Sequence, residues 1–142
     1  MSVFGYIQTY SHGDGRIGVL VQINCDDEFT AKTEAFLALA RDIALQIAAE
    51  SPRCIEAVDI DHAWWRDELE RIGPSLLKLT PAERLNRLAA ARDSFEQATC
   101  LLRQPFIKDP TISIHDYIES VSKQLRSPLR VVRFVRFDAA KV

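Results

Sequence analysis

The sequence predicts a fold in which strands near both ends of the chain flank a series of helices. Apolar residues alternate with mixed ones from Ile17 to Cys25, the period of a strand with one buried face. From about Glu28 to Ala49 the apolar spacing becomes helical, with Phe29 and Phe36 seven residues apart on one face. Residues 129–137 have again the composition of a strand.

The composition is typical of one globular domain, residues 1–142, with 47% hydrophobic residues. A net charge of −2 gives no electrostatic reason to expect nucleic acid. No apolar run approaches the roughly 20 residues that cross a bilayer, and the first residues do not have the pattern of a signal peptide. The three cysteines form no Cys-x-x-Cys motif, which favours reduced thiols in a cytoplasmic protein over a zinc site.

Local signals define most element boundaries. Residues 4–10 read as a first strand, and the glycine-containing turn at residues 11–15 predicts an antiparallel hairpin with the Ile17 strand. Asp27 occupies the N-cap position of the long helix, which Ser51-Pro52 ends. Further helix boundaries are expected at Asp59 or Asp61, Gly73-Pro74, Thr80-Pro81 and Ser113. The helix after Thr80 is expected to bury Leu85, Leu88, Phe95 and Leu102.

The last strand is apolar on both faces. Strict alternation points Val131, Val135 and Phe137 one way and Val132 and Phe134 the other. One layer of helices in so short a chain covers one face only. We therefore expect a second copy of the chain to cover the other, in a homodimer.

No residue pattern predicts catalysis, a metal or a cofactor. His12 with Asp14, and Asp59, Asp61 and His62, lie in turns and caps that attract such residues for backbone bonding. Trp64 and Trp65 are better explained by packing, because Trp65 continues a helical apolar spacing. Phe29 has two interpretations: core packing on the face of Phe36, or contact with another molecule from the first turn of the helix.

Four motifs resemble translation elongation factor Ts, in its dimerisation domain. They are Tyr10-x-His12-Gly-x-Gly15-Arg-Ile-Gly-Val-Leu-Val21 with Asn24-Cys25, then Asp42-Ile-Ala-x-Gln-Ile-Ala-Ala49, Leu101-Leu-x-Gln-Pro-Phe-Ile-Lys-Asp109 and Val131-Val132-Arg-Phe-Val-Arg-Phe137. The resemblance implies an α+β domain with a three-stranded antiparallel sheet and helices packed on one face. It also implies a factor that promotes GDP release from the GTPase elongation factor Tu, without being an enzyme, and homodimers that pair through their sheets.

The resemblance also implies site residues. The family motif Thr-Asp-Phe-Val reads here Asp27-Glu28-Phe29-Thr30, so Phe29 matches the aromatic wedge that enters the GTPase near Mg²⁺. Glu28 keeps the charge with one more methylene. His12, with Gly13 beside it, matches the hairpin region that contacts the partner. The family's Glu-Gly-Arg corresponds only to an alanine-rich stretch ending in Arg92.

Two functions remain open from the sequence. The first is an exchange factor for elongation factor Tu. The second is a dimerising interaction module that binds this GTPase, or another partner, without exchange activity. The altered Asp-Phe pair favours the second, as does the lack of a counterpart to the family's small N-terminal helical domain. That lack predicts a reduced factor, a paralogue with another role or a fragment.

Overall fold

The computed structural model describes residues 3–141, which divide into two compact units. Residues 3–51 and 105–141 make the first unit, and residues 52–104 make the second. The prediction that residues 1–142 form one domain remains a prediction. Within the described residues, none of the helices combines the length and the apolar character that crossing a bilayer requires.

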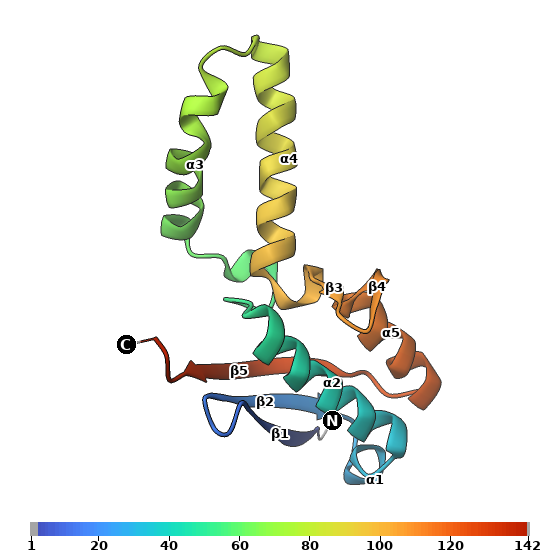
Figure 1. The fold of residues 1–142 in the computed structure, drawn as a ribbon. Coiled ribbons are helices and arrows are strands. Elements are labelled where there is room, and N and C mark those ends of the chain that lie inside the picture. Colours follow the sequence, from blue (N-terminus) through green and yellow to red (C-terminus); the bar gives the residue numbers. More distant parts are fainter. Residues whose placement is uncertain (1–2, 142) are drawn as a thin grey trace. The chain divides into compact units, whose positions relative to one another are not determined.

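The first unit contains the sheet and the helices that pack on it (Figure 1). Its elements are β1 (Phe4–His12), β2 (Ile17–Cys25), α1 (Glu28–Ala31), α2 (Glu34–Glu50), β3 (Pro105–Phe106), β4 (Asp109–Ser113), α5 (Ile114–Leu125) and β5 (Arg130–Asp138). Strands β1, β2 and β5 form an antiparallel sheet in the order β1-β2-β5, and β3 pairs with β4 separately. This confirms the predicted α+β class and its three-stranded antiparallel sheet.

Helix α2 covers one face of this sheet. Its apolar stripe is buried, with Phe36 and Ile43 fully inaccessible, against the alternate β2 residues Val21 and Ile23. The ring of Tyr6 from β1 packs edge-on against Phe36 at 5.5 Å between centroids. The period-two pattern of the β2 sequence therefore corresponds to the face that the helix buries.

The long helix predicted from Glu28 to Ala49 is in fact two helices. Thr33 has extended backbone angles (φ −71°, ψ 149°), which end the α1 segment and begin α2. The hydroxyl of Thr33 caps α2 by accepting a hydrogen bond from the amide of Phe36. The helical spacing between Phe29 and Phe36 therefore does not place them on one face.

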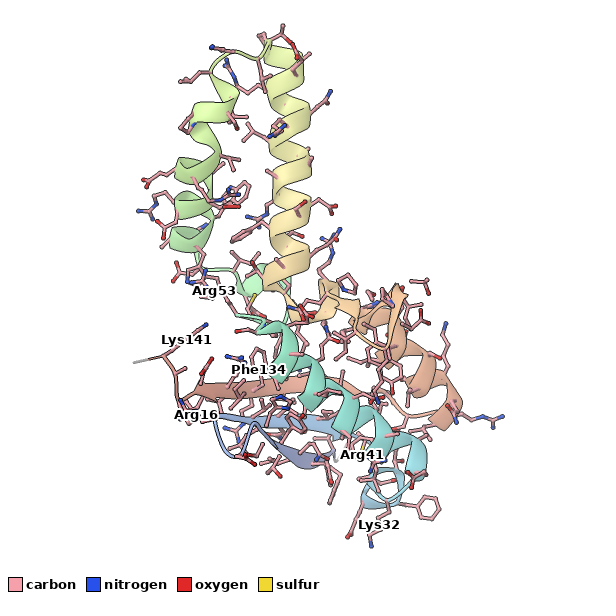
Figure 2. The ribbon with its side chains drawn as sticks, in the orientation of Figure 1. Arg16, Lys32, Arg41, Arg53, Phe134 and Lys141 are labelled. Atoms are coloured by element: carbon pink, nitrogen blue, oxygen red, sulfur yellow. The ribbon has the colours of Figure 1, made fainter. Side chains whose placement is uncertain are left out.

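A bulge corrects the predicted faces of β5. The pairing with β2 shifts between Gln22 and Ile23, so Ile23 pairs with Val131 while Val21 pairs with Phe134. Paired residues share a face, so Val131 and Phe134 both lie toward the helices. Val131 is accordingly buried, whereas the prediction placed it with Val135 and Phe137. Figure 2 shows Phe134 on the side of the sheet that carries α2.

The second unit is a helical hairpin. Its elements are the short 3₁₀ helices η1 (Ala57–Asp59) and η2 (Leu101–Arg103) and the helices α3 (His62–Leu76) and α4 (Pro81–Thr99). Asp61 caps α3, and Thr80 with Glu83 forms the predicted capping box of α4.

Two predictions for this unit are wrong. Helix α3 continues past Gly73 and through Pro74 to Leu76, although a proline at this position removes one backbone donor and crowds the carbonyl four residues earlier. None of the four residues predicted to be buried in the helix after Thr80 is fully buried: Leu85 is 70% exposed, Leu88 and Phe95 are half-buried, and Leu102, also half-buried, lies beyond α4 in η2. Trp65 does pack, with its ring 5.2 Å from that of Phe95, as the packing interpretation predicted.

Candidate partner-binding surface

The segment from Asp27 to Thr30 forms a short, well-capped helix that starts directly after β2. The Oδ1 atom of Asp27 accepts hydrogen bonds from the backbone amide of Thr30 at 2.8 Å and from its hydroxyl at 2.9 Å. These bonds favour the charged carboxylate, so they lower the pKa of Asp27 below its ordinary value. Asp27 is therefore the N-cap that the sequence predicted.

The other end of α1 is held by Thr33. Its hydroxyl donates to the carbonyl of Thr30 at 2.7 Å, and its amide donates to the same carbonyl at 3.1 Å. Thr30 and Ala31 are buried. The short helix is thus fixed at both ends and along its inner side.

Phe29 projects from this fixed helix into solvent. Its side chain is 81% exposed, whereas Phe36 is 0% exposed. The core-packing interpretation of Phe29 is therefore wrong, because the break at Thr33 separates it from the apolar stripe of α2. Glu28 beside it forms an exposed ion pair with Lys32 at 3.4 Å. Figure 2 shows Lys32 at the same end of the unit, extending away from the sheet.

Sequence reasoning missed a contact that supports this junction. The amide of Asp26 donates to Oγ of Ser127, a buried residue that follows α5. The hydroxyl of Ser122 in turn donates to the carbonyl of Ser127 at 2.7 Å. No local pattern signals a partner 101 residues away, so only the folded chain could identify it.

The predicted hairpin residues lie at the other end of β2. Gly13, Asp14 and Gly15 all have positive φ, the left-handed geometry that glycine adopts easily. His12 is exposed, and its Nδ1 atom lies 2.9 Å from the hydroxyl of Tyr10. That contact fixes the direction in which the ring points.

The structure does not bring the two predicted contact regions together. His12 and Gly13 precede β2, while Glu28 and Phe29 follow it, so the length of the strand separates them (Figure 1). At roughly 3.3 Å per residue, a nine-residue strand spans about 26 Å. A partner that contacts both regions must therefore extend along the whole strand.

The face of the sheet opposite α2 exposes apolar side chains. Strand pairing aligns Leu20 with Val135 and Gly18 with Phe137 on this face. Ile7, Leu20, Val135 and Phe137 are respectively 54%, 48%, 38% and 72% exposed. We call these four residues the open sheet face. Of the five residues predicted for a dimer interface, only Val135 and Phe137 belong to it; Val131 and Phe134 point to the helices, and Val132 is half-buried at the bulge.

Within residues 3–141, no three potential ligand residues (His, Cys, Asp or Glu) come together as a metal site. Asp61 is occupied as the cap of α3, and Asp59 accepts a hydrogen bond from the amide of Glu56. The Arg92 guanidinium pairs with Glu96 at 2.8 Å and lies over the ring of Trp65 at 5.0 Å. These polar residues therefore stabilise their own elements.

Comparison with known proteins agrees with the geometry. The family model described as elongation factor TS matches residues 2–141. The chain is 39% identical over 136 residues to elongation factor Ts of Carboxydothermus hydrogenoformans, covering 94% of the chain and 63% of that protein. It is 40% identical over 135 residues to elongation factor Ts of Methylacidiphilum infernorum, covering 94% and 67%. The chain thus spans about two thirds of these relatives' length, and it belongs to the elongation factor Ts family.

Proposed function

We propose that this protein binds elongation factor Tu and promotes the release of GDP from it. The observation that carries the proposal is the exposed Phe29 ring on a short helix fixed at both ends. An aromatic residue held in solvent by a rigid support loses little conformational entropy when it enters a partner, which makes it an effective anchor. Its position matches the aromatic residue of the family motif.

The proposed mechanism is thermodynamic linkage. A factor that binds the nucleotide-free GTPase more tightly than the GDP-bound form must weaken GDP binding by the same ratio. The factor forms and breaks no covalent bond, so it is an exchange factor and not a chemical catalyst. It would act in the cytoplasm, where translation takes place, with no nucleic acid or membrane as a direct partner.

Each predicted contact residue has a defined role in the proposal. Phe29 is the wedge, and Glu28 places a negative charge beside it. Asp27 orients the helix that carries both, and His12 with Gly13 supplies a second contact at the far end of β2. Because Glu28 pairs with Lys32 in the free protein, binding must exchange that ion pair for contacts with the GTPase.

A stopped-flow assay of labelled GDP leaving elongation factor Tu tests the proposal. We expect the wild-type chain to accelerate release and Phe29→Ala to abolish most of the acceleration. Leu77→Ala is a matched control, because Leu77 is an apolar side chain of similar exposure, 79%, in the second unit. Acceleration that survives in Phe29→Ala would contradict the role of the wedge.

The alternative is a module that binds elongation factor Tu without exchange. The acidic residue before Phe29 favours it, because Glu28 is one methylene longer than the aspartate of the family motif. Measurable binding with unchanged GDP release would establish this alternative.

We also propose a homodimer in which two copies bury the open sheet face against each other. Four exposed apolar residues on three adjacent strands form one continuous patch, the kind of surface that self-association covers. A sheet-to-sheet pair of this kind is isologous, so each residue meets the same patch of its partner.

A further inference from the structure

Two of the three cysteines lie side by side where the two arms of the second unit meet. Cys54 precedes η1, and Cys100 directly follows α4. They form an isolated parallel bridge, in which the amide of Leu101 donates to the carbonyl of Cys54 at 2.9 Å. Paired backbones lie about 4.8 Å apart, which is within the Cα separation that a disulfide accepts.

The two thiols are in direct contact. Cys54 Sγ and Cys100 Sγ are 3.7 Å apart, and both cysteines are free. A disulfide bond is about 2.05 Å long, so the sulfur atoms need to approach by about 1.6 Å for a bond to form. Cys54 is 8% exposed and Cys100 is 0% exposed, so an oxidant reaches Cys54 first.

The third cysteine offers an internal comparison. Cys25 is also free and buried, but it belongs to the first unit. Its thiol donates to the carbonyl of Asp27 at 3.2 Å, so its contact is a backbone oxygen. Burial alone therefore does not distinguish the cysteines, whereas the contact between two sulfur atoms does.

We propose that Cys54 and Cys100 are a redox-active pair that closes into a reversible disulfide at the base of the helical hairpin, with a peroxide as oxidant. The sulfur of Cys54 attacks hydrogen peroxide, the O–O bond breaks, and a sulfenic acid and water form. The thiol of Cys100 then attacks the sulfenic sulfur, forms the S–S bond and releases a second water. Two electrons and two protons leave the thiols, and one peroxide becomes two waters. A dithiol reductant reverses the change.

Burial controls the rate of this step. Burial, with the Cys100 thiol as the next cause, raises the pKa of Cys54 to about 12, and burial likewise raises the pKa of Cys100. Because the thiolate is the nucleophile, the pair is protected at neutral pH and reacts faster as the pH rises. Oxidation should therefore be slow at neutral pH.

The disulfide would stabilise the unit that has the least core of its own. Within α3 no residue is buried, and within α4 only Thr99 is buried. A bond between positions 54 and 100 encloses both helices in one loop, which restricts the unfolded chain and holds the hairpin base closed. Whether Cys54 and Cys100 are reduced or disulfide-bonded then determines how readily the helical hairpin opens.

Peptide mapping of the full chain after treatment with hydrogen peroxide at about pH 8.5 tests the proposal. We expect a peptide linking Cys54 to Cys100, a loss of about 2 Da, and a fall from three free thiols to one after denaturation. Dithiothreitol should restore all three. The oxidised chain should also show a higher melting temperature than the reduced chain.

Cys25→Ser is the matched control and should form the same link with the same rate. Cys54→Ser and Cys100→Ser should not form it. A thiol count that stays at three, a gain of oxygen mass without a link, or a link that includes Cys25 or a second chain would each overturn the proposal. The peptide map of the wild-type chain tests the proposal even if a serine variant fails to fold.

Discussion

The backbone amide of Asp26 donates a hydrogen bond of 3.1 Å to Oγ of Ser127, across 101 positions of the chain. This contact joins the start of the α1 segment to the residue that follows the left-handed end of α5, Arg126. It connects the two chain segments of the first unit, residues 3–51 and 105–141, at the base of the helix that carries Phe29. The segment that leads into the helix carrying the exposed Phe29 is therefore hydrogen-bonded to a buried serine.

Ser127→Ala should lower the free energy of unfolding by about 1 kcal/mol, because the amide of Asp26 loses its partner near the protein surface. Urea denaturation monitored by circular dichroism measures the change. Ser127→Thr keeps the hydroxyl and should recover most of the loss.

The same variant tests whether Ser127 acts through the wedge. In the GDP-release assay, Ser127→Ala should slow release in the wild-type background and have no further effect in the Phe29→Ala background. Equal effects in both backgrounds would show that the hydroxyl supports stability only.

Phe29→Ala and Phe36→Ala should differ strongly in stability. Phe29 is 81% exposed, so its truncation should change the free energy of unfolding by less than about 1 kcal/mol. Phe36 is fully buried on the face of α2 that packs on the sheet, so its truncation should cost about 3–5 kcal/mol through lost burial and a cavity. Urea denaturation of both variants checks this pair, and a large loss in Phe29→Ala would contradict the observed exposure.

Asp27 should contribute to the acid sensitivity of the fold. Hydrogen bonds from Thr30 lower the pKa of the folded carboxyl, so its stabilising contribution is complete above the unfolded pKa of about 3.9. The contribution is lost as the pH falls through the lower, folded pKa. Asp27→Asn keeps an N-cap acceptor without a charge, so its melting temperature should fall less between about pH 5 and pH 2.5 than that of the wild type. If the melting temperatures of the two proteins fell equally over this pH range, Asp27 would not be a source of the acid sensitivity.

Tyr117 should make stability fall at alkaline pH. Burial and the Asp42 carboxylate, which accepts its hydroxyl at 2.6 Å, raise the pKa of Tyr117 in the folded chain. The contribution of Tyr117 to the free energy of unfolding is thus fully present below its unfolded pKa of about 10. It is lost as the pH rises toward the pKa of Tyr117 in the folded chain.

Tyr117→Phe should therefore cost about 1–2 kcal/mol at pH 7, since Asp42 retains Lys108 at 2.6 Å. It should also lose less stability than the wild type between about pH 9 and pH 11, measured by urea denaturation. If Tyr117→Phe lost as much stability as the wild type over this pH range, the alkaline loss of stability would come from groups other than Tyr117.

The dimer proposal separates two neighbouring residues of β5. Val135→Asp places a charge on the open sheet face, so the chain should fold and run as a monomer by light scattering. Phe134→Asp places the charge under α2 and should instead lower the melting temperature sharply. A wild-type monomer at about 20 μM, well above the 1 μM constant that corresponds to about −8 kcal/mol, would reject the dimer.

The sequence alone determined the elements whose signals are local. The alternation in β2 identified its buried face, and Asp27, Thr80 and Ser113 marked helix starts that the structure confirms. These signals act within a few residues, because a cap bonds to an amide two or three positions away. The family motifs are likewise continuous stretches, so the sequence sufficed to recognise them.

The tertiary structure alone decided where these elements face. The spacing of Phe29 and Phe36 predicts one continuous helix, but Thr33 interrupts it, and this break leaves the ring of Phe29 exposed. A bulge against Gln22 turns Val131 inward, since a strand's faces depend on its register with a distant partner. The Ser127 contact also depends on such a partner. Which side chains are available to another protein was therefore settled by long-range pairing, which no short stretch of sequence encodes.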